Sequence, residues 1–333
     1  MTSGARTAIP TYAELARRTD APPGSSWGLF GPGDQLGMLN FLTPERTRAA
    51  AALVRRGATF DLDYQLNTFV PSIAGTRPPT EHHIFSNNPN HRDDWIDSFY
   101  LQSTSQVDGL RHIRHPRHGF YGGVADDAIA EGTPDLGIQL LSQKAIAGRG
   151  VLLDAVRYFA AVGRPLEYGT MTRITPADLD AIAEFCGVTV QPGDLVLLYT
   201  GYAEEWIART PEQRAMKSGA TGLDQSEEML AWIWDHQIAM MASDNAGLES
   251  FPVNPDSGWV DPDEPPPARG PSHNGMMHRP LIGLLGLIIG ELWKLDELAA
   301  DCAADGVHEF LLTVKPLNLV GGVGSPPNAI AIK

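Results

Sequence analysis

The side chains best suited to chemistry gather in a polar segment between residues 102 and 112. Asp108 and His112 lie four residues apart, and Gly109 between them lets the chain turn. An Asp and a His this close can form a hydrogen-bonded pair in which the carboxylate orients the imidazole as a general base. A polar strand end with a solvated histidine is the alternative. We take Asp108 and His112 as candidate catalytic residues.

The residues before Asp108 alternate in a way that extends this site. The stretch from Trp95 to Leu101 predicts a strand, in which successive side chains point to opposite faces. If the alternation continues, one face carries Gln102, Thr104, Gln106 and Asp108. Gln102 and Gln106 are therefore candidate substrate-binding residues.

Two further candidates lie late in the chain. His278 is followed by an apolar run, Pro280–Gly290, and then by Glu291, so a buried segment can return both groups to one site. Asp244 follows an apolar run that predicts a strand, and strand ends in α/β proteins commonly face the ligand crevice. An Asx-turn explains Asp244 equally well.

His115 and His118 extend the first segment but are poorly suited to bind a metal. Pro116 breaks any helix that would align them, and Arg114 and Arg117 would repel a cation. We expect these two histidines to be surface residues or substrate contacts.

The elements that must position these groups alternate along the chain. Thr and Pro pairs followed by an acid are typical helix starts, and short apolar runs are typical of buried strands. Helices are expected at about residues 43–57, 175–187, 226–236 and 295–304, and strands at 150–154, 195–199, 238–242 and 310–314. Residues 21–26, 71–80 and 252–272 are rich in Pro and Gly, and the last stretch predicts a long extended loop, either a functional lid or disordered. The pattern predicts an α/β chain with a large, partly mixed sheet.

Composition excludes several classes of protein. The 333 residues include 25 Lys and Arg against 40 Asp and Glu, a formal charge of −15, which argues against nucleic-acid and anionic-membrane partners. Two cysteines exclude a disulfide scaffold and an all-cysteine zinc site. The sequence shows no P-loop, Gly-x-Ser-x-Gly elbow, His-Glu-x-x-His motif or dinucleotide fingerprint. Without an apparent signal peptide or membrane span, we expect a cytoplasmic protein acting on a small molecule.

Several segments together resemble the cyclase family of metal-dependent hydrolases, which includes bacterial kynurenine formamidases and isatin hydrolases. The matching pieces are residues 148–154, 193–201, 242–245, His278 with Glu291, and 324–331. The resemblance implies a swivelling β/β/α architecture, with a mixed sheet or open barrel and flanking helices in a single domain. It also implies a homo-oligomer, a dimer or tetramer. We expect residues 1–30 to form an N-terminal arm and residues 31–333 the catalytic domain.

The family's metal motif, His-x-Gly-Thr-His-x-Asp-x-Pro-x-His, matches this chain only in part. The resemblance implies that Asp108 is the bridging aspartate, His112 the general acid/base, His278 a later ligand and Glu291 the ligand carboxylate. Gln102 and Gln106 stand where the first two ligand histidines belong. Thr104-Ser105 and Gly109-Leu110 also depart from the motif.

The two glutamines change the expected metal chemistry. An amide oxygen is a poor zinc ligand compared with imidazole, so a compact two-zinc site is not expected. One divalent ion, manganese or zinc, could still bind to Asp108 and His278 with Gln106 or Glu291, and a hard ion would suit these oxygens. The alternative is no metal, with His112, Asp108 and Glu291 acting alone.

The resulting functional hypothesis is a small-molecule hydrolase that opens an amide, lactam, lactone or ester with activated water. One alternative is a metal-independent lyase or cyclase that dehydrates its substrate or closes a ring. Another is an inactive binding protein. Tyr121, with Phe30, Phe85 and the loop around Trp259, is expected to shape the substrate pocket, and Trp232 and Trp234 to lie in the core or an interface.

Overall fold

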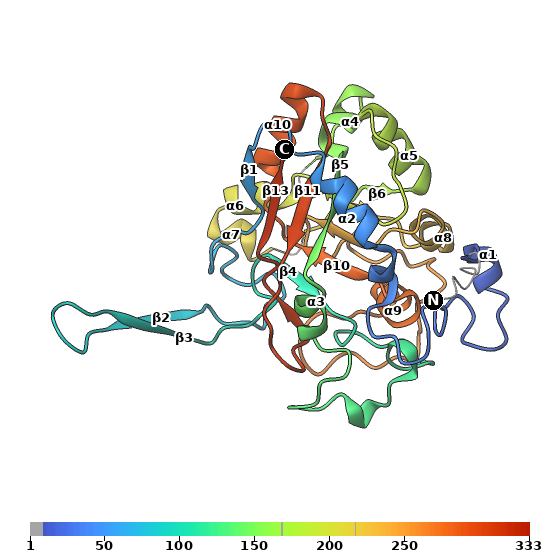
Figure 1. Ribbon diagram of the computed structural model, residues 1–333, viewed down its shortest axis with the longest axis horizontal. Coiled ribbons are helices and arrows are strands. Elements are labelled where there is room, and N and C mark those ends of the chain that lie inside the picture. The colour runs from blue at the N-terminus through green and yellow to red at the C-terminus, as the bar shows by residue number, and fades with distance from the viewer. Residues whose placement is uncertain (1–8, 168, 217) are drawn as a thin grey trace.

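The computed structural model describes residues 9–333 except 168 and 217. In this part of the chain nine strands form one curled sheet, with helices packed around it (Figure 1). In spatial order they are β1 (Thr59–Asp61), β13 (Ala329–Ile332), β11 (Glu309–Val314), β5 (Ile146–Asp154), β7 (Leu195–Tyr199), β9 (Met240–Ser243), β10 (Ile288–Glu291), β4 (Gln106–Asp108) and β12 (Gly324–Ser325). Strands β5, β7, β9 and β10 run parallel, and the other neighbours pair antiparallel. The predicted α/β class with a mixed sheet and flanking helices is confirmed.

The remaining elements are helices, short helical turns and two small ribbons. The helices are α1 (Tyr12–Leu15), α2 (Pro44–Ala51), α3 (Gln139–Lys144), α4 (Ala155–Ala161), α5 (Pro176–Phe185), α6 (Tyr202–Ala208), α7 (Pro211–Arg214), α8 (Glu227–Asp235), α9 (His278–Pro280) and α10 (Asp296–Asp305). The turns are the 3₁₀ segments η1 (Gly37–Phe41), η2 (Tyr121–Gly123) and η3 (Asp126–Ala128), and the π-helical η4 (Leu281–Leu285). The ribbons pair β2 (Glu81–Phe85) with β3 (Asp93–Asp97), and β6 (Arg173–Ile174) with β8 (Gly222–Leu223). None of the helices just named has the length and apolar character needed to cross a membrane.

The predicted helix starts are confirmed by their caps. Thr43, Thr175 and Ser226 each accept a hydrogen bond from a backbone N–H in the first turn, which typically contributes about 1 kcal/mol. The first of these helices is shorter than expected, because α2 ends at Ala51 and not at Gly57.

The strand expected from Trp95 to Leu101 and continuing to Asp108 is wrong in its extent. β3 covers Asp93–Asp97 and pairs only with β2, outside the main sheet. The chain then turns, with the Ser103 N–H bonded to the Tyr100 carbonyl, and re-enters the main sheet as β4 at Gln106. The alternating polar pattern therefore spans a turn and a short strand.

The core lies on the inner side of the curled sheet and under its helices. Trp234 and Trp293 are its largest fully buried side chains. The Trp234 Nε1 donates to the Pro10 carbonyl at 2.7 Å, and the Trp232 Nε1 donates to Asp180 at 2.7 Å. Both tryptophans of α8 are buried as predicted, with their polar atoms satisfied.

The N-terminal segment packs against the part of the chain that follows His278. Of the predicted arm, residues 1–8 lie outside the described part of the chain. Beyond them, the Trp27 Nε1 donates to the Gly283 carbonyl and the Ser26 Oγ donates to the Leu285 carbonyl. Gly37 meets Gly286 so closely that a Cβ on Gly37 would lie 2.2 Å from the Gly286 oxygen. The boundary at residue 30 stays a prediction.

Candidate active site

Three polar side chains share one face of the sheet where β4 meets β10. In this antiparallel pair Gln106 is opposite Glu291, and Asp108 is opposite Ile289. Directly opposed residues of a ladder point to the same face. Gln106, Asp108 and Glu291 therefore converge, and the Gln106 Nε2 donates a hydrogen bond to Glu291.

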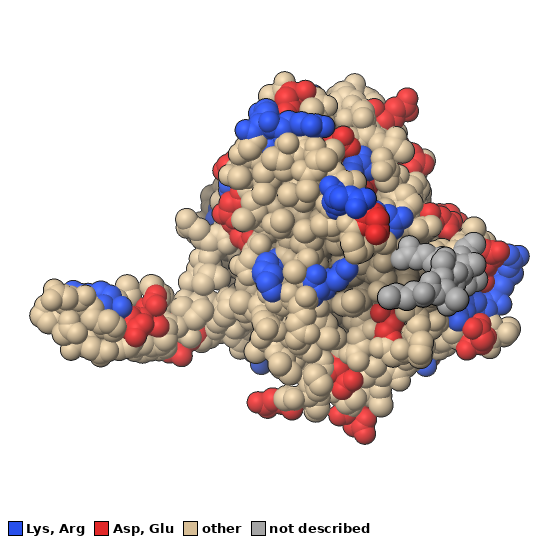
Figure 2. Space-filling view, in the orientation of Figure 1, with Lys and Arg blue, Asp and Glu red and all other residues tan. Residues whose placement is uncertain are grey.

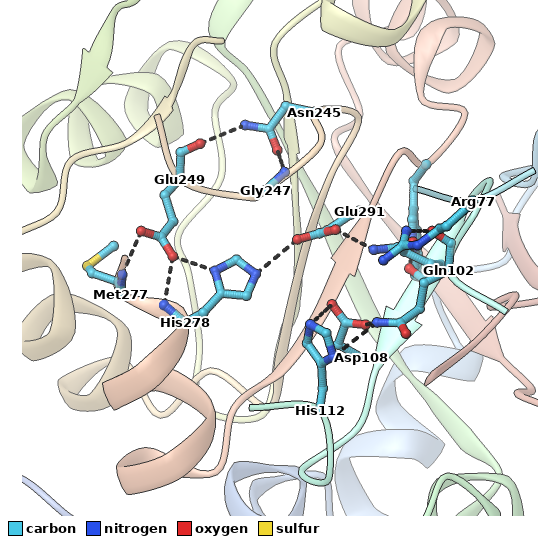
Figure 3. Close-up of polar contacts among 12 residues, drawn as sticks. Arg77, Gln102, Asp108, His112, Asn245, Gly247, Glu249, Met277, His278 and Glu291 are labelled. Atoms are coloured by element: carbon cyan, nitrogen blue, oxygen red, sulfur yellow. Dashed lines mark hydrogen bonds and ion pairs between the residues drawn. The ribbon is translucent and has the colours of Figure 1, made fainter. Parts of the chain in front are cut away.

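His278 reaches this face from α9 and is held there by a residue that the sequence did not reveal (Figure 3). The Glu249 carboxylate accepts hydrogen bonds from His278 Nδ1 at 2.5 Å, from the His278 N–H at 2.7 Å and from the Met277 N–H at 2.6 Å. The opposite ring nitrogen, Nε2, faces Glu291 Oε1 at 2.9 Å. Glu249 therefore directs His278 toward the polar face, and no motif or spacing in the sequence connects these two residues.

Asp108, His278 and Glu291 form a compact buried group with unused binding capacity. One potential ligand atom from each lies within 4.8 Å of the others, and all three residues are buried. Among the described residues, Asp108 Oδ2 and Gln106 Oε1 are buried without a hydrogen-bond partner. Such atoms are costly to bury unless something binds them. Carboxylate, imidazole and amide-oxygen donors suit a divalent cation such as manganese, so these residues fit a single metal ion.

The predicted hydrogen bond between Asp108 and His112 is absent, and Gln102 takes its place. His112 Nε2 lies 3.9 Å from Asp108 Oδ2, which is too far for a hydrogen bond. The Gln102 Nε2 instead donates to Asp108 Oδ1 and contacts His112 Nδ1 at 3.2 Å. Because a carboxylate can only accept, the amide nitrogen must face Asp108, so His112 Nδ1 is an acceptor. In neutral His112 the proton then sits on Nε2.

Burial and neighbouring charges shift the pKa values of these groups in opposite directions. Burial alone lowers the pKa of His278, but its hydrogen bonds to Glu249 and Glu291 outweigh burial and hold that pKa well above its usual value. Burial, followed by the charge of Asp108, raises the pKa of Glu291. Burial lowers the pKa of His112 more than Asp108 raises it, so His112 is neutral at pH 7. Its side chain remains 18% exposed, which leaves it within reach of a ligand.

The two Pro- and Gly-rich loops meet beside the cluster and supply two more side chains that the sequence did not single out. Arg77, in the first loop, donates to the Gln102 carbonyl and acts electrostatically on Glu291 and His112. The His273 ring lies 6.2 Å from that of His112 and 6.1 Å from that of His278. Arg269 joins the loops through a hydrogen bond to the Thr76 carbonyl. The only feature of the sequence that could have pointed to Arg77 and His273 was the Pro- and Gly-rich composition of these loops.

Two predicted substrate-binding residues lie outside the cluster. Asp244 is buried at the end of β9, where its Oδ1 accepts from the N–H and hydroxyl of Thr200. Tyr121 is buried too, and its hydroxyl donates to Asp34 Oδ2 at 2.9 Å. Asp244 Oδ1 and the Tyr121 hydroxyl are engaged within the fold, whereas Asp244 Oδ2 is buried without a hydrogen-bond partner. The substrate-binding roles of both residues stay predictions.

The other pocket residues proposed from the sequence are likewise dispersed. Phe85 lies in the β2–β3 ribbon, outside the main sheet, and is 39% exposed, so its expected role in the pocket stays a prediction. His115 and His118 stack on each other at 4.8 Å in a turn closed by His115 and Gly119. The residues brought together are thus Gln102, Gln106, Asp108, His112, His278 and Glu291, joined by Arg77, Glu249 and His273.

Comparisons with known proteins agree with this fold. The Cyclase family model matches residues 60–250. A crystal structure described as a novel cyclase is 33% identical, with a TM-score of 0.78 over 93% of this chain and 99% of that chain. Isatin hydrolase A from Labrenzia aggregata, bound to benzyl benzoate, is 16% identical, with a TM-score of 0.55 over 85% of this chain and 94% of its own. An isatin hydrolase bound to the product analogue thioisatinate is 16% identical, with a TM-score of 0.54 over 87% and 98%. A comparison with curated proteins gave no match.

Proposed function

This chain belongs to the cyclase family, and from that premise we propose that it is a hydrolase that opens an amide, lactam, lactone or ester bond of a small carbonyl compound. One observation carries the proposal: the buried Asp108–His278–Glu291 group and the neighbouring Gln106 leave two polar oxygens, Asp108 Oδ2 and Gln106 Oε1, without hydrogen-bond partners. Such a group has free capacity to bind a ligand. The shared fold with isatin hydrolases supports hydrolysis of a small molecule.

Asp108, His278 and Glu291 would hold one divalent ion, manganese or zinc. When bound, the ion would polarise the substrate carbonyl and lower the pKa of water towards about 7. Glu249 prepares His278 for this role, because a carboxylate that accepts from one ring nitrogen directs the other toward the ligand.

The remaining residues handle the substrate and the proton. His112, neutral and protonated on Nε2, donates a hydrogen bond to the oxygen on which negative charge develops as water adds to the carbonyl carbon. When no ion occupies Asp108, its Oδ2, 3.9 Å from that nitrogen, accepts the proton lost by the water. The carbon–nitrogen or carbon–oxygen bond then breaks, and the same proton passes to the leaving atom.

Heavy-oxygen water tests the reaction directly. The purified protein, with and without added manganese, is incubated with a panel of amides, lactams, lactones and esters in labelled water. Hydrolysis places one labelled oxygen in the product carboxylate, which mass spectrometry detects. Product formed without label would contradict the proposal.

One alternative keeps support from the residues themselves, namely a metal-independent lyase or cyclase. Gln102 and Gln106 replace two imidazoles that the family motif supplies, and both amides donate to the carboxylates of the cluster. Asp108 Oδ2 would then remove a proton from carbon, and the substrate would lose water. The labelled-water experiment separates the two reactions, because elimination or ring closure incorporates no oxygen from solvent.

A further inference from the structure

The long loop between β9 and α9 brings a further histidine to the candidate metal site. His273 lies in this loop, and its ring centre is 6.1 Å from that of His278 and 6.2 Å from that of His112. The ring is partly buried and makes no hydrogen bond with any described residue. His273 is not one of the residues that the family motif selects. An imidazole beside the buried group is therefore left with both nitrogens free to bind a ligand.

Hydrogen bonds within the loop fix the backbone on either side of His273. The Asn274 Nδ2 donates to the Asp261 carbonyl at 2.7 Å, and the Asp261 N–H donates to Asn274 Oδ1 at 2.8 Å. The Met276 N–H donates to the His273 carbonyl at 3.1 Å, which closes a turn just before α9. His273 and His278 thus approach the cluster from the two sides of one short turn.

The donor atoms already in the buried group are mostly oxygens. Asp108, Gln106 and Glu291 offer oxygens, and His278 Nε2 is the one nitrogen beside them. Magnesium and calcium prefer oxygen donors, whereas imidazole nitrogen suits zinc and related transition metals. A second imidazole in this group would therefore change which ion it selects.

The charges around the group favour a cation. Three buried carboxylates in the cluster stand against two cations, Arg77 and protonated His278, and an ion bound at Nε2 would replace the His278 proton. Arg279 acts electrostatically on His273, but Glu264 accepts from its Nη1 at 2.6 Å and offsets its charge. On the face of the molecule shown in Figure 2, by contrast, acidic side chains lie in small groups, several of them beside Lys or Arg. The buried cluster thus has an excess of negative charge that a cation would neutralise.

We propose that His273 is a further ligand of the divalent ion, and that binding of the ion anchors the long loop at the site. The inference rests on the metal site of the proposed function and adds to it a ligand that the family motif lacks. With metal–nitrogen bonds of about 2.0–2.1 Å, two imidazoles on one ion have ring centres roughly 4.5–6.5 Å apart. The rings of His273 and His278 lie 6.1 Å apart, within this range. With two nitrogen donors the site should prefer zinc to magnesium.

Cobalt spectroscopy with a cysteine at position 273 tests the contact directly. A thiolate bound to cobalt(II) gives a sulfur-to-metal charge-transfer band in the near ultraviolet. The full chain carrying His273→Cys, freed of metal and titrated with cobalt, should develop this band. His118→Cys is the matched control, because His118 is exposed in a separate turn, and it should give no band. The wild type provides the baseline, since Cys186 and Cys302 are buried.

Two measurements need no introduced ligand. Pulsed electron paramagnetic resonance of bound manganese counts coordinated imidazoles, and we expect two in the wild type and in His118→Ala but one in His273→Ala. Isothermal titration with zinc should give a dissociation constant at least about tenfold higher in His273→Ala, because even the loss of a residue that only orients a ligand costs about ten- to hundredfold. Magnesium binding should change less, so the preference for zinc should fall.

Hydrogen–deuterium exchange tests the anchoring of the loop. Zinc should slow exchange in residues 252–277 of the wild type but not of His273→Ala. A single imidazole in the wild type, the same number in wild type and His273→Ala, or no band in metal-loaded His273→Cys would overturn the role of His273 and leave the metal site standing. A wild type that binds no divalent ion would overturn the inference too, while incorporation of labelled oxygen would still decide separately whether the protein is a hydrolase.

Discussion

Glu249 accepts hydrogen bonds from both the backbone N–H and the ring Nδ1 of His278, at 2.7 and 2.5 Å. These contacts leave Nε2 directed at Glu291, 2.9 Å away. A side chain separated from His278 by most of a long loop thus sets the orientation of the candidate imidazole ligand.

We expect Glu249→Gln to weaken metal binding by about ten- to hundredfold. The amide nitrogen cannot accept a hydrogen bond, so glutamine cannot accept from His278 Nδ1 and from both backbone N–H groups as the carboxylate does. Isothermal titration with manganese measures the change. Glu131→Gln is the control, since Glu131 is an exposed acid outside the cluster. Equal affinities in wild type and Glu249→Gln would show that His278 is oriented by other means.

Metal should stabilise the wild type but not an Asp108→Asn variant. A ligand at a hundred times its dissociation constant raises the free energy of unfolding by about 2.7 kcal/mol. Thermal unfolding with manganese and with a chelator measures this gain, and activity should fall with the chelator in parallel. Asp127→Asn, an exposed acid, is the control. A full metal-induced gain in Asp108→Asn would remove Asp108 from the ligands.

Gln102→Leu should allow His112 to adopt either neutral tautomer. Without the amide donor, His112 Nδ1 can carry the proton, and kcat should fall at least about tenfold with little change in KM. Nitrogen NMR of the His112 ring reports the tautomer independently of turnover. Gln143→Leu at an exposed position serves as control. An unchanged ring spectrum would show that Gln102 does not determine the proton position.

Arg77→Met should weaken product binding. Hydrolysis of any amide, lactone or ester leaves a carboxylate, and Arg77 places a positive charge beside the cluster in which it forms. A hydrogen bond to a charged group contributes about 1.5–3 kcal/mol, so the product inhibition constant should rise roughly ten- to hundredfold. Inhibition kinetics measure it, with Arg114→Met at an exposed ion pair as control. Unaltered inhibition would place the product away from Arg77.

Asp244 should make stability depend on pH. Burial raises the pKa of Asp244 to about 6 from 3.8, so the folded protein holds this proton more tightly than the unfolded chain. The stabilisation is fully present below pH 3.8 and is lost as pH rises through 6. Relative to Asp244→Asn, the wild type should lose about 3 kcal/mol of unfolding free energy between about pH 4 and pH 8. Denaturant unfolding of both proteins at several pH values measures this difference. If the unfolding free energies of wild type and Asp244→Asn depended on pH in the same way, the prediction would be contradicted.

Local signals in the sequence were sufficient for most of the predicted helices and strands and for six of the nine residues of the cluster. Capping residues such as Thr175 and Ser226 located helices, because their hydrogen bonds form within one turn. The motif resemblance selected Asp108, His112, His278 and Glu291, which the structure brings together. Local logic did not reveal the hydrogen bonds of Asp244 to Thr200 and of Tyr121 to Asp34, because these depend on distant packing. The substrate-binding roles of these two residues stay predictions.

The sequence by itself determined the α/β class, the family and the identities of the polar groups, because alternation, caps and motif residues are properties of neighbouring positions. Only the tertiary structure decided that Gln102, and not Asp108, bonds His112, and that Glu249 and Arg77 join the cluster. It also decided that the stretch around Trp95 is a separate ribbon and not a strand of the main sheet. These outcomes depend on which segments pair with each other across long separations in the chain. The alternation of side chains along a strand has the same period of two in a large sheet and in an isolated ribbon, so it does not show which of the two forms.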